Sequence, residues 1–443
     1  MDFVISNATV VTMNAERAVL RDAEIVISER RIVKVGPPTR GGKTGARRML
    51  DARGSVVVPG FIHGHLHACQ TLCRNRADGL ELLDWLRERI WPHEAAHDAE
   101  SMRASADLTF LELIKSGATG LQDMGSVRHY DQVFESARDC GIRLTGGKAM
   151  MDHGQGLPAS LRETTEESIA ESLKLLARWH GQEDGRLRYA FAPRFVLSCT
   201  EPLLRQVVEL AKKHGARIHT HASENPTECD AVREKTGMDN VAYFGHLGML
   251  GPHTTLAHCV WLTANEHRLL RETGTCVCHC PGSNLKLASG FAKVPELLEE
   301  HVSLSLGSDG APCNNNLDIF VEMRLAALIH KPRAGPTAVS AEQVLEMATM
   351  GGARAIGMDH EVGSIEVGKR ADLSVVQLGS AHATPGGEDV IAQLVFAGKA
   401  EDVSDVMIDG QWVMKNREVL TLDEPRVIAS ARKHAERIAL AVA

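Results

Sequence analysis

The stretch PGFIHGHLH, residues 59–67, ends a short apolar run with two histidines, His65 and His67, two positions apart. Side chains two positions apart on a β-strand point to the same side, so these imidazoles can bind one cation. His63 has the same parity but lies one layer further back along the strand. We therefore predict a strand that ends at a metal site, with His65 and His67 as ligands. The alternative is a loop in which both histidines only form hydrogen bonds.

The chain from about residue 61 to 360 alternates strand-like apolar runs with amphipathic helical stretches, such as TEPLLRQVVELAKKH at 200–214 before ARIHTHAS. Further strand candidates are TGLQDM, RLTGGKAM, RYAFAPRF, TTLAHCV, TCVCHC and VSLSLGSD. This alternation is typical of βα units, and the number of strands favours an α/β fold with a parallel (β/α)8 barrel. In such barrels the functional side chains gather at the C-terminal ends of the strands.

A second histidine pair lies in ARIHTHASEN at 216–225. The C-terminal member of the pair should lie nearer the barrel mouth, so we predict His221 as a ligand. His219 is then expected in the core or behind the ligands. Glu224 follows three residues after His221, where a carboxylate can reach a metal-bound water.

Two more predicted strands end in a polar group: LAHC ends at His258, and SLSLGSDG places Asp309 directly before Gly310. Taken singly, such a histidine is more often a buried core residue, and an Asp-Gly pair is usually a turn. Four separate strands ending in this way favour one shared site. The predicted metal ligands are His65, His67, His221 and Asp309.

A catalytic metal site keeps one position open for water and lowers the pKa of that water from 15.7 towards about 7. Asp309 can both bind the metal and accept the proton of the water. The competing candidates Cys276, Cys278, Cys280 and His279 alternate within one predicted strand, whereas structural zinc sites usually draw on loops. The chain also lacks the Pro-Cys-x-x-Cys signature of cytidine deaminases.

Both ends of the chain carry strand patterns of period two, at 3–12, 24–36, 55–60, 364–378 and 403–416. The last pattern contains an Asp-Gly pair between apolar runs, which predicts a tight hairpin. We predict that residues 1–58 and 363–443 form one small β-sandwich beside a catalytic barrel of residues 59–362. Residues 424–443 are expected to form a helix.

The composition disfavours a polynucleotide partner, because acidic residues outnumber Lys and Arg by 57 to 49 and only 4% of residues are aromatic. Ten cysteines are too few for a disulfide scaffold and indicate reduced thiols. The N-terminus lacks the pattern of a signal peptide, and no run of about 18 apolar residues occurs. We expect a cytoplasmic homo-oligomer that acts on a small molecule and binds neither nucleic acid nor membranes.

The order of HxH, HTHxxEN, AHC and SDG resembles the amidohydrolase superfamily, specifically its aminohydrolases acting on aromatic rings. The resemblance spans nearly the whole chain and implies a barrel with a flanking β-sandwich and one divalent ion, usually zinc or iron. It implies the four ligands named above and gives proton transfer to Glu224 and His258. Glu224 would protonate a ring nitrogen while hydroxide attacks the amino-bearing carbon, and ammonia leaves. Members with two metals and a carboxylated lysine match less well, with Lys148 the nearest candidate.

Segments 79–98, 280–290 and 308–333 resemble deaminases of 5'-deoxyadenosine, methylthioadenosine and S-adenosylhomocysteine. In that group the residue matching Glu94 binds the ribose hydroxyls, which suits the strong hydrogen bonds of a carboxylate. The alternative for Glu94 is an exposed carboxylate at the start of a helix.

Other positions resemble guanine deaminase: Gln70, residues 147–152 and residues 192–195. Arg194 can donate to a ring oxygen or nitrogen, or form a salt bridge at the barrel rim. Trp85 either packs over the ligand or fills core.

We favour an adenine nucleoside as substrate, because Glu94 and the loop at 314–316 fit that group. The alternatives are a guanine or pterin base and a triazine, since triazine hydrolases resemble residues 358–373. Expelling an amine needs a proton donor, whereas expelling chloride does not. The presence of Glu224 therefore favours deamination. A binding module without catalysis would not need all six metal-site and proton-transfer residues.

Overall fold

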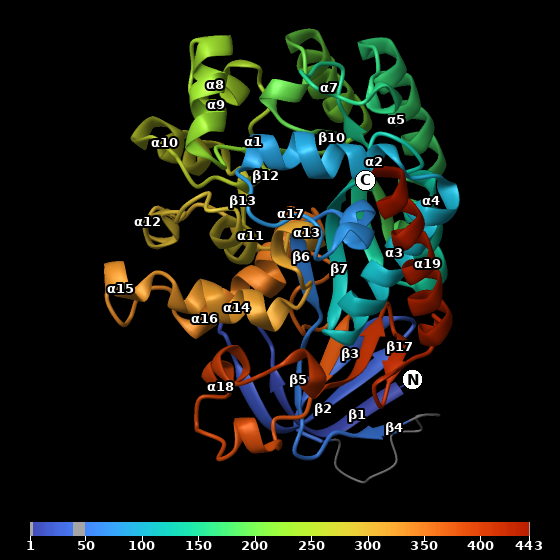
Figure 1. Ribbon diagram of the computed structural model, residues 1–443. Coiled ribbons are helices and arrows are strands. Elements are labelled where there is room, and N and C mark those ends of the chain that lie inside the picture. Colours follow the sequence, from blue (N-terminus) through green and yellow to red (C-terminus); the bar gives the residue numbers. More distant parts are fainter. Residues whose placement is uncertain (1–2, 39–48, 443) are drawn as a thin grey trace.

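The computed structural model describes residues 3–38 and 49–442 (Figure 1). Eight parallel strands form a near-closed barrel in the order β14-β13-β12-β11-β10-β8-β7-β6, and the short β9 pairs with β10. The strands are β6 (Phe61–Leu66), β7 (Ala118–Met124), β8 (Arg143–Gly147), β9 (Ala149–Met150), β10 (Leu187–Pro193), β11 (Arg217–Ala222), β12 (Thr254–His258), β13 (Cys276–His279) and β14 (Leu304–Leu306). The predicted parallel barrel is therefore confirmed.

Helices connect the strands around the outside of the barrel, as α7 (Glu201–His214) illustrates. The Thr200 side chain accepts a hydrogen bond from Leu203 N at the start, and Gly215 ends the helix in the left-handed region at φ 62°. Both are favourable caps, because they satisfy or end the free backbone groups of a helix.

The other longer helices are α3 (Ala99–Lys115), α4 (Asp131–Cys140), α5 (Thr165–Trp179), α8 (Pro226–Thr236), α9 (Asn240–His246), α10 (Ala264–Thr273), α14 (Ile319–Leu328), α18 (Val390–Phe396) and α19 (Glu424–Val442). The short ones are η1 (Ala68–Cys73), α1 (Leu82–Trp85), η2 (Leu86–Ile90), α2 (Trp91–Ala95), η3 (Ala159–Leu161), α6 (Gln182–Gly185), η4 (Val196–Ser198), α11 (Pro281–Lys286), α12 (Val294–Glu299), α13 (Ala311–Asn314), α15 (Lys331–Ala334), α16 (Ala341–Glu346), η5 (Met347–Gly351), α17 (Gly352–Ala355), η6 (Ala381–Ala383) and η7 (Ala400–Asp402). The predicted C-terminal helix, α19, lies against α3 on one side of the barrel (Figure 1).

The two ends of the chain share a second sheet, which lies below the barrel in Figure 1. Its order is β18-β17-β16-β15-β5-β1-β2-β3, and β4 pairs with β1. The strands are β1 (Phe3–Val11), β2 (Val19–Ser28), β3 (Arg31–Gly36), β4 (Met49–Asp51), β5 (Val56–Pro59), β15 (Leu373–Val376), β16 (Val403–Ile408), β17 (Gln411–Lys415) and β18 (Glu418–Val419). Strand β5 joins the two ends, because it is parallel to β1 and antiparallel to β15.

The predicted Asp-Gly hairpin joins β16 to β17. Asp409 and Gly410 have φ values of 53° and 73°, and Ile408 pairs with Gln411 across the turn. Two consecutive left-handed residues are typical of the tight hairpin turn that Asp-Gly favours.

A buried ion pair fastens the terminal sheet to the barrel. Arg143 on β8 donates from Nε and a terminal guanidinium nitrogen to Asp372, at 2.8 and 2.9 Å. Asp372 directly precedes β15 and also accepts from Asp409 N at 2.8 Å. Arg143 is 1% exposed, so water cannot stabilise its positive charge. The carboxylates of Asp372 and of Asp409, 3.6 Å away, do so instead.

We expect Asp372→Ala to lower the free energy of unfolding by about 3 kcal/mol, because it deprives a buried guanidinium of its main partner. Urea denaturation measures this loss. The control is Asp51→Ala, which removes an exposed carboxylate 3.8 Å from Arg53 and should cost much less, because water screens exposed ion pairs. Equal losses in the two variants would show that the Arg143–Asp372 pair does not stabilise the junction.

All ten cysteines lie in the described part of the chain, where they are free and buried. Among the described residues, no helix is long and apolar enough to cross a membrane.

Candidate active site

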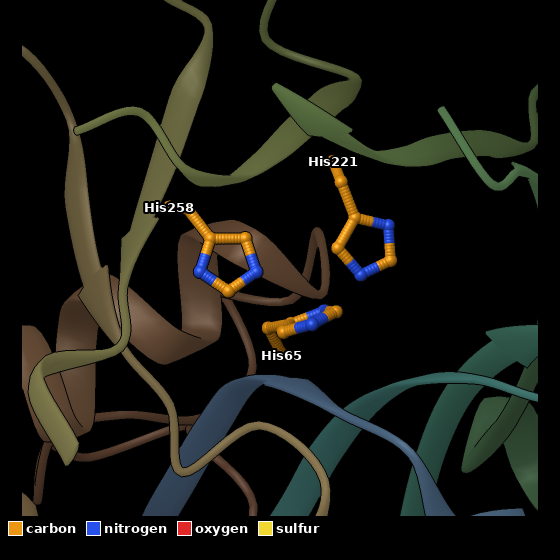
Figure 2. A group of neighbouring side chains, drawn as sticks. All are labelled: His65, His221 and His258. Atoms are coloured by element: carbon orange, nitrogen blue, oxygen red, sulfur yellow. The ribbon is translucent and has the colours of Figure 1, made fainter. Parts of the chain in front are cut away.

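The predicted strand ends converge at one end of the barrel. His65 and His67 come from β6 and the residue after it, His221 from β11, His258 from β12 and Asp309 from the turn after β14. Two groups have ligand atoms all within 4.8 Å of one another: His65 with His67 and Asp309, and His65 with His221 and His258. Figure 2 shows the imidazoles of the second group pointing toward one another.

The hydrogen bonds of two predicted histidine ligands, His67 and His221, leave the same ring nitrogen available in each. His67 Nδ1 lies 2.7 Å from Met124 O, and His221 Nδ1 lies 2.7 Å from Arg194 O. A carbonyl only accepts, so both Nδ1 atoms carry the proton and both Nε2 atoms keep a lone pair. The two Nε2 atoms are 3.2 Å apart.

The third ligand, His65, is held from behind by a further histidine. His65 Nδ1 lies 2.8 Å from His219 Nε2, and His65 Nε2 lies 3.1 Å from Asp309 Oδ1. Burial lowers the pKa of His65 and of His221, and lowers that of His67 to about 3, which favours neutral imidazoles. Neutral imidazole is the form that binds a metal.

Asp309 is anionic and held in a fixed orientation. Burial opposes its ionisation, but the hydrogen bond with His65 and the neighbouring His258 hold the pKa of Asp309 well below its usual range. Ser283 Oγ donates to Oδ2 at 2.6 Å and Gly310 N to Oδ1 at 2.7 Å.

The backbone of Asp309 is left-handed, with φ of 60°. At the next position, Gly310, a Cβ would lie 2.1 Å from Gln70 Oε1, so a larger residue would displace the Gln70 amide. The Asp-Gly pair lies in the loop after β14, where Asp309 presents its carboxylate and Gly310 precedes α13.

The other residues considered as metal ligands are not part of this cluster. His63 is buried beside Ser308, and Lys148 forms a buried ion pair with Glu163 at 2.7 Å. In the described ranges 3–38 and 49–442, both groups able to hold a metal contain His65, and neither includes a cysteine of β13.

Glu224 and His258 form a second pair beside the ligands, with Glu224 Oε2 3.4 Å from His258 Nε2. Burial raises the pKa of Glu224 to about 7. Burial alone would lower the pKa of His258, but Glu224 and Asp309 together raise it above its usual value. Groups with pKa values near neutrality suit proton transfer in either direction.

The orientation of the His258 ring is fixed by Asn284, whose Oδ1 lies 2.9 Å from His258 Nδ1. Within the described residues, His258 Nε2 and Glu224 Oε1 are buried and have no hydrogen-bond partner. Such groups need a further polar partner, which a water molecule or a substrate can supply.

A narrow, partly open cavity lies over these groups. Leu82, Trp85, Leu86 and Phe195 give it an apolar wall. Trp85 lines the cavity and also belongs to a buried apolar cluster, and its Nε1 donates to Ala77 O at 3.0 Å, so a role over the ligand stays a prediction.

The three residues predicted to select the substrate form one buried cluster. Arg194 donates to both carboxylate oxygens of Glu94, at 2.7 and 3.1 Å, and Gln70 Nε2 donates to Glu94 Oε1 at 2.9 Å. Arg194 lines the cavity, and Glu94 is 2% exposed, which excludes the alternative of an exposed carboxylate at a helix start.

Sequence reasoning missed Ser283 and Asn284, which contact Asp309 and His258 from α11. Two signals could have found them: segment 280–290 resembles the deaminases named above, and PGSN at 281–284 begins two residues after the end of β13. It also missed Glu228, which lies four residues after Glu224 and lines the cavity.

The donor set fits a divalent cation. Three neutral imidazoles and one carboxylate are ligands that zinc accepts and that several other divalent ions also accept. The residues that would hold it are His65, His67, His221 and Asp309, each with a partner that orients it.

The barrel and this cluster define a metal-dependent hydrolase. Residues 56–413 match the model of the amidohydrolase family. The chain belongs to the amidohydrolase family.

Named relatives match over nearly the full length. The chain is 40% identical to a 5'-deoxyadenosine deaminase of Methanosarcina acetivorans, covering 99% of this chain and 98% of that protein. It is 38% identical to a 5-methylthioadenosine/S-adenosylhomocysteine deaminase of Pelotomaculum thermopropionicum, covering 99% of both.

Solved structures share the fold. An adenosine deaminase from Xanthomonas campestris with bound zinc has a TM-score of 0.92 and 32% identity, covering 99% of both chains. An atrazine chlorohydrolase from Arthrobacter aurescens complexed with zinc has a TM-score of 0.91 and 25% identity, covering 98% of this chain and 100% of the other. Guanine deaminase of E. coli has a TM-score of 0.82 and 27% identity, covering 93% and 98%.

Proposed function

We propose that the protein hydrolytically deaminates an adenine nucleoside, such as 5'-deoxyadenosine, methylthioadenosine, S-adenosylhomocysteine or adenosine, with release of ammonia. The observation that carries this proposal is that three histidines able to bind a metal, together with Asp309, converge with the Glu224–His258 pair at one cavity. The names of the relatives, which include deaminases of these nucleosides, support the substrate class.

Zinc is the proposed metal, since the similar adenosine deaminase structure contains it. When bound, such a cation lowers the pKa of a water ligand from 15.7 towards about 7. Asp309 and Glu224 are the carboxylates placed to take up the proton that the water loses.

The proposed proton transfers use the Glu224–His258 pair. Glu224 protonates a nitrogen of the purine ring, which makes the neighbouring amino-bearing carbon more electrophilic. His258 orients the attacking oxygen through Nε2, because Asn284 fixes the opposite side of the ring. One water is consumed and one ammonia released, so adenosine would give inosine.

This proposal is tested by incubating the zinc-loaded protein with adenosine and measuring ammonia and inosine. We expect the two products in equal amounts, and neither after the metal has been removed by a chelator. Undiminished ammonia release by metal-free protein would refute the role of the metal.

We propose that Glu94, with Arg194 and Gln70, recognises the ribose of the nucleoside. A carboxylate has about four acceptor sites, of which Arg194 and Gln70 occupy three. Ribose hydroxyls would therefore replace part of these hydrogen bonds rather than add to them.

We expect Glu94→Ala to reduce kcat/KM for adenosine by about 100-fold, since it removes two charge-assisted hydrogen bonds, and to affect a free aminopurine base far less. Steady-state kinetics with adenosine and adenine measure the contrast. An equal loss on both compounds would show that Glu94 has no role in ribose recognition.

Guanine deamination is the second candidate, because Arg194 lines the cavity and can donate to a ring oxygen. The names of the relatives, which include deaminases of adenine nucleosides, favour the nucleoside. A cytoplasmic location and a homo-oligomeric state stay predictions from the sequence.

A further inference from the structure

Glu228 on α8 is a buried carboxyl group that has no role in the mechanism above. It lines the cavity and is 2% exposed. Its Oε2 accepts a hydrogen bond from Glu224 N at 3.0 Å, and its Oε1 accepts one from Asn240 Nδ2. Glu228 thus connects the backbone of Glu224 to α9.

The backbone just before Glu224 is strained. Ser223 has φ of 51°, in the left-handed region, which is unfavourable for a residue other than glycine and persists only when the surroundings fix it. On one side, Ser223 O accepts hydrogen bonds from Val260 N and Trp261 N, both at 2.9 Å. On the other side, Glu228 holds the amide of Glu224.

The side chain of Glu224 is held much less firmly than its backbone. Among the described residues, Glu224 Oε1 has no hydrogen-bond partner, and Oε2 lies 3.4 Å from His258 Nε2. The direction in which this carboxyl group points is therefore set mainly by the backbone at residues 223–224.

We propose that Glu228 is a positioning residue, which fixes the strained turn at Ser223 and thereby aims the Glu224 carboxyl group at His258 and the substrate. The proposal rests on the proposed deaminase function, in which Glu224 moves the proton. Glu228 needs no contact with the reacting atoms for this role.

The competing explanation is simple helix capping. Glu228 is the third residue of α8, after the N-cap Asn225, and glutamate at this position commonly bonds backbone amides at the helix start. Glu266 has the same position in α10, is 1% exposed and accepts from Thr263 N at 2.9 Å. Glu266 does not line the cavity, so it is a matched control.

The test is a double-mutant cycle with adenosine as substrate, using Glu228→Ala and Glu266→Ala in the natural chain and in the Glu224→Gln background. We expect Glu228→Ala to lower kcat about 10-fold or more in the natural chain, with KM and zinc content little changed. In the Glu224→Gln background the same change should cost less than about threefold, because the group it positions is already disabled. Glu228→Gln, whose amide oxygen can still accept from Glu224 N, should recover most of the loss.

An equal loss of kcat in both backgrounds, or an equal loss in Glu266→Ala, would overturn the proposal. A crystal structure of zinc-loaded Glu228→Ala provides a readout without turnover: the Glu224 carboxyl group should move away from His258, and an unmoved Glu224 would also overturn it. If the natural chain releases no ammonia from nucleosides, the deaminase function fails, while this structure still decides whether Glu228 positions Glu224.

Discussion

Replacing His65 with alanine is expected to abolish metal binding and, with it, nearly all deaminase activity. His65 belongs to both groups of residues whose ligand atoms lie close enough to share a metal. It also contacts Asp309 and His219, so its loss leaves a carboxylate and an imidazole without their partner. Removing only a group that orients a ligand weakens metal binding by 10- to 100-fold in other proteins, so losing a ligand should exceed about 100-fold.

Asp309→Asn should have a similar effect, because it removes the negative charge that the three neutral imidazoles cannot supply. Zinc content after dialysis and kcat measured at saturating metal check both variants. The control is His279→Ala, which removes another buried histidine at a strand end, from β13, outside the groups that can hold a metal. Full zinc occupancy in His65→Ala and Asp309→Asn would disprove the ligand assignment.

Glu224→Gln is expected to retain zinc but to lose about 10²- to 10⁴-fold in kcat, the usual range for removing a general acid–base group. Burial raises the pKa of Glu224 to about 7, so at neutral pH the natural residue is present in both protonation states. The amide of glutamine has the same shape but cannot exchange a proton in this range.

Zinc content, KM and kcat of this variant separate the roles of the site. Unchanged zinc and KM with a reduced kcat are expected if Glu224 acts in proton transfer alone. A loss of zinc would make Glu224 a ligand, and turnover equal to that of the natural chain would exclude it from proton transfer.

The convergence of the four proposed ligands could be predicted from the sequence, because it depends mainly on strand geometry. The two-residue spacing of His65 and His67 and the strand-end positions of His221 and Asp309 follow from the alternation of side chains and from the common end of a parallel barrel. The preference for His221 over His219 used the same geometry, and His219 indeed lies against His65 from behind.

The contacts between different loops could not be predicted in this way. The cluster of Gln70, Glu94 and Arg194 joins three separate segments of the chain. Nothing in the spacing of these residues indicates that their side chains contact one another. Asn284 and Glu228 act through hydrogen bonds to His258 and to the backbone of Glu224, which no spacing pattern reveals. Side-chain partners that lie far apart in sequence depend on tertiary packing.

The most direct test of a metal-dependent adenine nucleoside deaminase is a comparison of kcat/KM for ammonia release from five compounds by the zinc-loaded protein. The compounds are adenosine, 5'-deoxyadenosine, methylthioadenosine, S-adenosylhomocysteine and guanine. We predict that at least one adenine nucleoside exceeds guanine by about 100-fold or more, since guanine lacks the ribose hydroxyls that the Glu94 cluster is proposed to bind. A value for guanine equal to or above that of every nucleoside would contradict the proposed function.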